Sequence, residues 1–188
     1  MRRTDAHAHR PLPADTELAR AVAVLARDAQ DAVWRRTRAL QELRSLLREY
    51  YPGFLAAFHR GGATNLAGAE ARQLLALAPT PVSAAKLTPV RIATALRRAG
   101  RQPGIDALTA ELHQAFRVPQ LRQLPLIEKA LGRQAVALLA TLNAECDNAE
   151  TLGQAAVEAF QQHADHEVIT SFPGMGELSG GTAPGRDR

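Results

Sequence analysis

Residues 15–50 read DTELARAVAVLARDAQDAVWRRTRALQELRSLLREY, and this stretch decides the fold. Its apolar residues recur in alternating steps of four and three, which is typical of a long helix that buries one stripe against another helix. Asp15 and Thr16 offer capping oxygens, and Pro52 and Gly53 are expected to end the helix. At about 54 Å this helix is too long for one compact core, so it needs a long partner. Its seam consists of Leu18, Val22, Leu25, Ala29, Ala32, Arg36, Ala39, Leu43, Leu46 and Tyr50.

A second seam with the same spacing begins near Leu126 and continues to about Ala164. It includes one polar residue, Glu145, and the helix contains two glycines, Gly132 and Gly153, that weaken it without changing the seam. Residues 1–60 hold 11 basic and 7 acidic groups, whereas residues 123–167 hold 7 acidic and 2 basic groups. Opposite charge on two helices of similar length favours pairing between them. The seam of the second helix consists of Leu131, Ala135, Leu138, Leu142, Glu145, Ala149, Leu152, Ala156 and Ala159.

These two seams predict an all-α protein built on a long antiparallel coiled-coil hairpin. The first helix occupies residues 15–50 and the second occupies residues 125–166, with a basic helical insert at residues 51–124 at the tip. Residues 1–14 are expected to form an extended arm, because Pro11 and Pro13 discourage helix. Residues 181–188, GTAPGRDR, are expected to form an aberrant, disordered tail.

The insert is expected to contain short helices separated by Gly and Pro. The first runs from Leu66 to about Leu77 and is capped by Asn65. The next starts at Pro89, after the cap Thr88, and stops before Gly100. A third covers residues 105–116.

From residue 61 to 124 the insert carries eight basic and three acidic residues. A surface of this kind is either a nucleic-acid contact or an ordinary solvated charged face. The candidate contact residues are Lys86, Arg91, Arg97, Arg98 and Arg101.

The segment 167–180 resembles the first half of a helix-hairpin-helix. In that motif, glycines let backbone N–H groups approach a phosphate. The turn Gly174-Met175-Gly176 supplies these positions and is a second candidate nucleic-acid contact.

Composition restricts the other function classes. Arginine outnumbers lysine 21 to 2, which suits phosphate recognition but also fits a bias in codon composition. The single cysteine, Cys146, excludes an internal disulfide and fits a reducing, cytoplasmic compartment. No apolar run is long enough to span a bilayer, so no membrane partner is expected. The histidine pairs at 7/9 and 163/166 lack the further ligands of a zinc site, and neither Ser171 nor Ser179 has an evident activating base.

Five stretches together resemble the DEDD-type transposases of bacterial insertion sequences. These recombinases have a RuvC-like domain, a coiled-coil insert and a C-terminal domain with a catalytic serine. The resemblance covers residues 1 to about 179. The stretches are RTDAHAHRPLPAD, RTRALQELRSLLREYYPGFLAAF, LAPTPVSAAKLT, LRRAGRQPGID and VITSFPGMG.

The resemblance implies DNA transposition and recombination, with DNA as a partner, and it allows a guide RNA. It also implies self-association through the coiled coil and magnesium-dependent strand exchange in the intact enzyme. The family's four acidic ligands and its serine nucleophile match no residue of this chain, and Asp5 lies downstream of the acidic cluster. We therefore expect a truncated, catalytically inactive internal fragment with no cofactor of its own. The alternative is a helical coiled-coil interaction protein with no nucleic-acid role.

Overall fold

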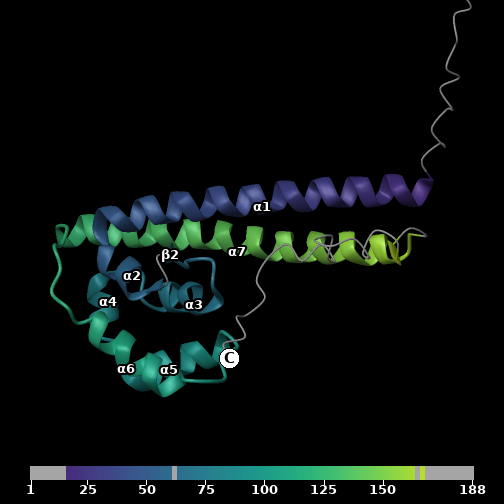
Figure 1. Ribbon diagram of the computed structural model, residues 1–188. Coiled ribbons are helices and arrows are strands. Elements are labelled where there is room, and N and C mark those ends of the chain that lie inside the picture. The colour runs from purple at the N-terminus through teal and green to yellow at the C-terminus, as the bar shows by residue number, and fades with distance from the viewer. Residues whose placement is uncertain (1–15, 61–62, 164–165, 168–188) are drawn as a thin grey trace, which may run out of the picture. The chain divides into compact units, whose positions relative to one another are not determined.

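A computed structural model describes residues 16–60, 63–163 and 166–167 of the chain. In these residues the predicted all-α class is confirmed, with one small two-stranded ribbon added (Figure 1). The ribbon pairs its strands antiparallel, with His59 opposite Thr64. In order, the elements are α1 (Glu17–Tyr50), α2 (Pro52–Ala57), β1 (His59–Arg60), β2 (Ala63–Thr64), α3 (Ala69–Leu77), α4 (Pro81–Ala85), α5 (Pro89–Arg98), α6 (Ile105–Ala115) and α7 (Pro125–Gln161).

The chain divides into two compact units. Unit 1 comprises residues 1–29 and 152–188, and its described part contains the start of α1 and the end of α7. Unit 2 comprises residues 30–151 and contains the rest of α1 and α7 with all the short elements. The predicted extended arm, the Gly174-Met175-Gly176 turn and the predicted disordered tail lie outside the described residues.

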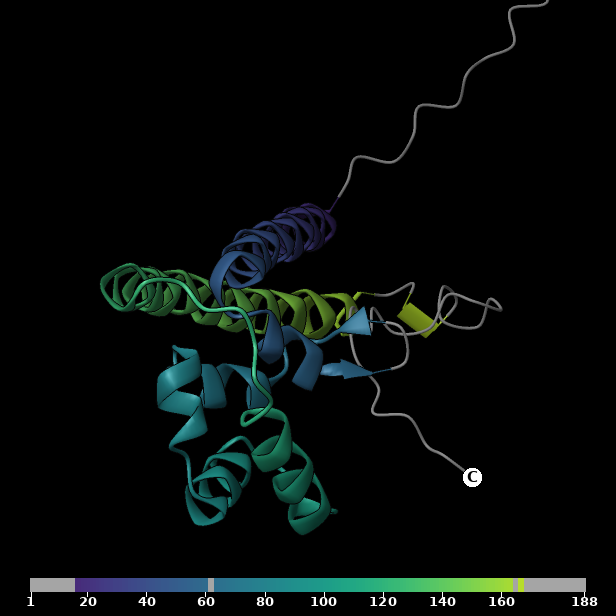
Figure 2. The same cartoon turned by 90° about the vertical axis from the view of Figure 1, so that its left-hand side faces the viewer.

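Unit 2 has one continuous apolar core to which all seven helices contribute. Leucines from α1, α3, α5, α6 and α7 are nearly or fully excluded from solvent, for example Leu43, Leu74, Leu96, Leu112 and Leu142. The α5 and α6 helices lie on the side of this unit remote from α1, as two views show (Figures 1 and 2). The core therefore fixes α5 while leaving its other face open to solvent.

Every predicted seam position on α1 and α7 is buried or half-buried. Within unit 2, Arg35 Nε lies 3.1 Å from Glu145 Oε2, and Gln123 Nε2 donates to the Glu49 carbonyl at 3.3 Å. The later α1 residue, Glu49, meets a residue just before α7, and the earlier one, Arg35, meets the middle of α7, so the two helices run antiparallel in this unit. Glu145, the polar break in the second seam, is explained by its arginine partner.

Buried polar groups at the end of α1 and the start of α7 lie close enough for the Glu128 charge to act on the Tyr50 hydroxyl group. Glu128 is 3% exposed, and Arg122 donates to both of its carboxylate oxygens at 2.6 and 2.9 Å. Tyr50 Oη donates to the Pro79 carbonyl at 2.6 Å, while the buried Tyr51 Oη has no hydrogen-bond partner among the described residues. We call Tyr50, Tyr51, Arg122, Glu128 and Gly132 the α7 junction.

Glycine at position 132 of the α7 junction allows a close approach between α7 and the α3–α4 turn. A Cβ atom there would lie 2.5 Å from the Thr80 Cγ2 methyl group and 3.4 Å from the Pro79 carbonyl oxygen. The sequence prediction that Gly132 only weakens the helix was incomplete, because Gly132 also lets the α3–α4 turn approach α7. At Gly153 a Cβ would meet no described residue within 4 Å, so no comparable close approach is seen there.

Two predicted helix boundaries were wrong. α3 begins at Ala69, not Leu66, because the Asn65 side chain accepts from Gly68 N at 3.0 Å and forms a local turn before the helix. α7 ends at Gln161, short of residues 164–166. Thr16 caps the start of α1 as expected, by accepting from Ala19 N at 3.1 Å.

Two short helices were missed because their prolines were interpreted only as terminators. Pro52 ends α1 but is also the first residue of α2. Pro81 begins α4, where Thr80 and Ser83 form a reciprocal capping box. Proline at the first helical position is favourable, since its missing N–H has no intrahelical acceptor there.

Among the described helices, none combines the length and the apolar character needed to cross a membrane.

Candidate nucleic-acid interface

The α5 helix has the signals that the sequence predicted. Thr88 Oγ1 accepts from Arg91 N at 3.4 Å, and Pro89 occupies the first helical position. Gly100 follows the helix with φ of +86°, a conformation that glycine adopts without strain. These caps define the helix between residues 89 and 98, and the buried Ile92 and Leu96 fix its orientation in the core.

The opposite face of α5 is exposed and cationic. Arg91, Thr94, Arg97 and Arg98 form what we call the α5 face, and all four are exposed. Arg91 and Arg98 are seven residues apart, which places them on the same side of the helix two turns apart. No hydrogen bond or ion pair joins the guanidinium group of Arg91, Arg97 or Arg98 to another described residue. These charges are therefore available to a ligand.

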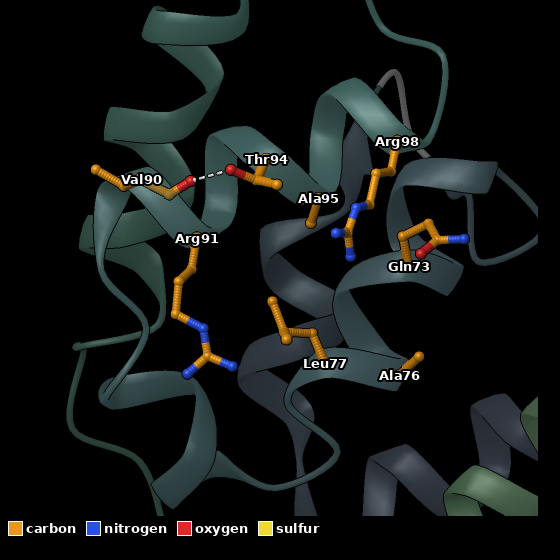
Figure 3. A pocket seen from close by; sticks show the side chains of 8 residues that line it. All are labelled: Gln73, Ala76, Leu77, Val90, Arg91, Thr94, Ala95 and Arg98. Carbon is orange, nitrogen blue, oxygen red and sulfur yellow. Dashed lines mark hydrogen bonds between the residues drawn. The ribbon is translucent and has the colours of Figure 1, made fainter.

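A cleft of about 460 Å³ separates α5 from α3. Its floor is apolar, with Leu77 and Ala95, and an arginine stands at each end of the α5 side (Figure 3). Arg98 extends across the opening toward Gln73, whereas Arg91 extends from the other end (Figure 3). The α3–α5 cleft is lined by Gln73, Ala76, Leu77, Val90, Arg91, Thr94, Ala95 and Arg98.

The other two candidate residues of the insert do not lie on α5. Lys86 is exposed and follows the last residue of α4. Arg101 lies beyond the end of α5, where its Nη1 is 2.7 Å from Glu70 Oε1 and its Nε donates to the Pro103 carbonyl at 3.0 Å. The Arg101 guanidinium group is therefore bound within the protein, whereas the exposed Lys86 side chain is open to a ligand.

Several other arginines in the described residues have structural roles that the sequence did not indicate. Arg72 donates to the Ala67 carbonyl at 3.0 Å and to Asn143 Oδ1 at 2.8 Å. Arg117 donates to the carbonyls of His113 and Leu87 at 2.9 and 3.0 Å. Their partners are up to 71 residues away in sequence, so no local pattern distinguishes them from the arginines of the α5 face.

The described residues include no group of three or more His, Cys, Asp and Glu side chains arranged to hold a metal ion. The His166 ring packs edge-on against Phe160, with ring centroids 5.1 Å apart. Burial raises the pKa of the Cys146 thiol, although the nearby Arg72 and Arg36 oppose this effect. The thiol form is thus favoured, which disfavours Cys146 as a nucleophile. His7, His9, Ser171 and Ser179 lie outside the described residues.

Comparison with known proteins gives one informative relative. The chain is 50% identical over 180 residues to the "Mini-circle putative transposase for IS117" of Streptomyces coelicolor. The match includes 95% of this chain but only 43% of the relative, so the chain spans less than half the length of the curated relative. No family model matches the chain. No solved structure matches it.

This similarity supports the transposase resemblance that the five sequence stretches indicated. The relative's name does not state a catalytic class, so the DEDD-type assignment and the RuvC-like domain stay predictions. The aligned length of 180 residues is long enough to include unit 2.

Proposed function

We propose that this chain supplies a helical DNA-contacting part of a transposase, and that the α5 face binds the phosphate backbone. One combination of observations carries the proposal. The chain is 50% identical to the IS117 putative transposase over 180 residues. Two of the three exposed arginines of its α5 face, Arg91 and Arg98, line a cleft and have no hydrogen bond or ion pair with another described residue. Guanidinium groups match phosphate oxygens in geometry and charge.

The proposal covers binding and includes no strand-cleavage step. Lys86 belongs to the same proposed contact surface in a secondary role. The Gly174-Met175-Gly176 turn, which lies outside the described residues, is proposed as a separate contact. DNA as the partner would place the protein in the bacterial cytoplasm. Because arginine supplies the positive charge, we expect binding to need no metal cofactor and to persist in EDTA.

The test is a titration of fluorescein-labelled duplex DNA, followed by fluorescence anisotropy at several salt concentrations. Log K should fall linearly with log salt, because each phosphate contact releases counterions. The Arg91→Gln/Arg98→Gln variant should flatten this slope by about 2, or about 1 for each arginine. A charge-matched control, Arg20→Gln/Arg27→Gln, removes two exposed arginines from α1 and should flatten the slope much less.

Two outcomes would redirect the proposal. Absence of binding at 50 mM salt would remove the nucleic-acid role and favour the alternative, a helical interaction protein. Tighter binding of RNA than of DNA of the same sequence would instead support the guide-RNA partner that the resemblance allows.

We also propose that the seams of α1 and α7 pack as a coiled coil and that it mediates self-association. The half-buried seam residue Leu25 and its exposed neighbour Val24 provide a matched test. Leu25→Asp should lower helicity and weaken any oligomer measured by light scattering, because it places a charge in the seam. Val24→Asp should change neither, and equal effects of the two variants would contradict the seam.

A further inference from the structure

A second cleft in unit 2 carries the two basic residues of the otherwise acidic second long helix. The cleft measures about 310 Å³ and lies between α7 and the turn that joins α3 to α4. Residues 123–167 contain seven acidic residues but only two basic ones, Lys129 and Arg133. Both line this cleft, which we call the α3–α7 cleft. Its lining consists of Pro79, Thr80, Lys129, Gly132, Arg133 and Val136.

The two cations of this cleft are available to a ligand. Lys129 and Arg133 are four residues apart and therefore share one face of α7. Both are exposed, and neither side chain has a hydrogen bond or ion pair with another described residue. The carboxylate nearest in sequence, Glu128, is buried and already held by two hydrogen bonds from Arg122. The first turns of α7 thus present net positive charge.

The polar atoms on the opposite wall are already used inside the protein. The Thr80 hydroxyl group accepts from Ser83 N at 3.2 Å, and the Pro79 carbonyl accepts from Tyr50 Oη at 2.6 Å. The close approach at Gly132 fixes this wall against α7. An anion entering the cleft would therefore be bound by Lys129 and Arg133, against walls that are already in place.

The α3–α7 cleft and the α3–α5 cleft flank the same end of α3. Gln73, Ala76 and Leu77 line the α3–α5 cleft, and Pro79 and Thr80, which directly follow α3, line the other. Both clefts belong to unit 2 and share its core. A polyanion that crosses the end of α3 could contact both sets of cations.

We propose that Lys129 and Arg133 form a second phosphate-binding site for the DNA that the α5 face contacts, so that the backbone passes across the end of α3. This inference rests on the proposed function, because it assumes that the α5 face binds DNA. It assigns a binding role to α7, a helix whose sequence appears acidic as a whole.

The experiment uses the full chain in the anisotropy titration described above. Lys129→Gln/Arg133→Gln should flatten the slope of log K against log salt by about 2, and combining it with Arg91→Gln/Arg98→Gln should flatten it by about 4. The Arg20→Gln/Arg27→Gln control removes the same charge from α1. Circular dichroism at 222 nm should show unchanged helicity in all variants.

A second pair of variants tests position instead of net charge. Val136→Glu places a carboxylate at the α3–α7 cleft, whereas Thr141→Glu places one at an exposed α7 position outside its lining. Val136→Glu should reduce the affinity for DNA by a larger factor than Thr141→Glu.

The outcomes separate this inference from the function on which it rests. If Arg91→Gln/Arg98→Gln flattens the slope but Lys129→Gln/Arg133→Gln behaves like the α1 control, the second site is rejected and the α5 face stands. Equal losses from Val136→Glu and Thr141→Glu would also reject the second site. If the wild-type chain does not bind, or if the α5 variant behaves like the control, the proposed function itself fails.

Discussion

The α7 junction and the α5 face both contain arginine, but the arginine is paired inside the protein at the junction and open to solvent on the face. At the α7 junction, Arg122 makes two hydrogen bonds to a carboxylate that is 3% exposed. On the α5 face, Arg91 and Arg98 line a cleft and have no hydrogen bond or ion pair with another described residue. The difference shows that an arginine's contribution depends on what it pairs with. Removing an arginine should affect stability in one region and binding in the other.

The largest expected effect is the loss of Arg122. Arg122→Ala would leave the Glu128 carboxylate buried without its partner, and such losses cost about 3–5 kcal/mol in fully buried pairs. Since the Arg122 side chain is 42% exposed, water can partly replace it, and we expect a loss of about 2–3 kcal/mol. Urea unfolding followed by circular dichroism measures this change.

The matched control is Arg91→Gln/Arg98→Gln, which should change the free energy of unfolding by less than about 0.5 kcal/mol. Similar stability losses in the two variants would abolish the distinction between the two regions.

The next effect is a loss of stability at alkaline pH. Burial, together with the Glu128 charge, raises the pKa of Tyr50 above its ordinary value of 10.0, and burial, Tyr50 and Glu128 do the same for Tyr51. The folded state therefore favours the neutral phenols. This stability is fully present below pH 10 and should be lost above it, at about 1.4 kcal/mol per pH unit for each tyrosine. Urea unfolding between pH 9 and pH 11 measures the slope.

Tyr51→Phe serves as the control for this titration. The buried Tyr51 Oη has no hydrogen-bond partner, so the substitution should cost little at pH 7 and should roughly halve the alkaline slope. An unchanged slope would mean that other groups cause the alkaline loss.

A smaller effect comes from close packing at Gly132. Gly132→Ala gains about 1 kcal/mol of helix propensity but forces a Cβ to within 2.5 Å of Thr80 Cγ2. The capping box holds Thr80 in place, so we expect overpacking to dominate and to destabilise the protein by a net 1–2 kcal/mol, to order of magnitude. Thermal unfolding measures the change.

Gly153 provides the matched substitution in the same helix. Gly153→Ala meets nothing within 4 Å and should stabilise the protein by up to about 1 kcal/mol. If both alanine variants were stabilised alike, the close approach at the α7 junction would be disproved.

The sequence predicted the helices of this fold better than the contacts between them. The seam spacing and the Thr88, Pro89 and Gly100 signals identified α1, α5 and α7, because these signals act within a few residues. The α2 helix was missed because Pro52 both ends one helix and begins the next.

Candidate residues were harder to separate by function. The sequence grouped Arg101 with Arg91 and Arg98, yet Arg101 pairs with a carboxylate 31 residues earlier in the chain. It also overlooked Lys129 and Arg133, because an excess of acidic residues along α7 masked a local basic site. The Arg101 ion pair and the α3–α7 cleft both depend on tertiary contacts between the α3 region and a later helix or loop. No local sequence pattern specifies such contacts.

The smallest expected effect concerns the ion pair between Glu70 and Arg101. This arginine is paired with a carboxylate, as at the α7 junction, but the pair is partly exposed to solvent. Their side chains are 31% and 29% exposed, so Glu70→Gln should cost only about 0.5 kcal/mol of stability. The same substitution frees a guanidinium group just beyond the α5 face, however, and should steepen the salt dependence of DNA binding by about 1. Asp106→Asn removes an equal charge from an exposed position in the first turn of the neighbouring α6 helix and serves as the control. A gain in slope for Glu70→Gln alone would show that pairing within the protein withholds Arg101 from the nucleic acid. A loss of about 2 kcal/mol or more without a change in slope would place Arg101 with Arg122 as a structural residue.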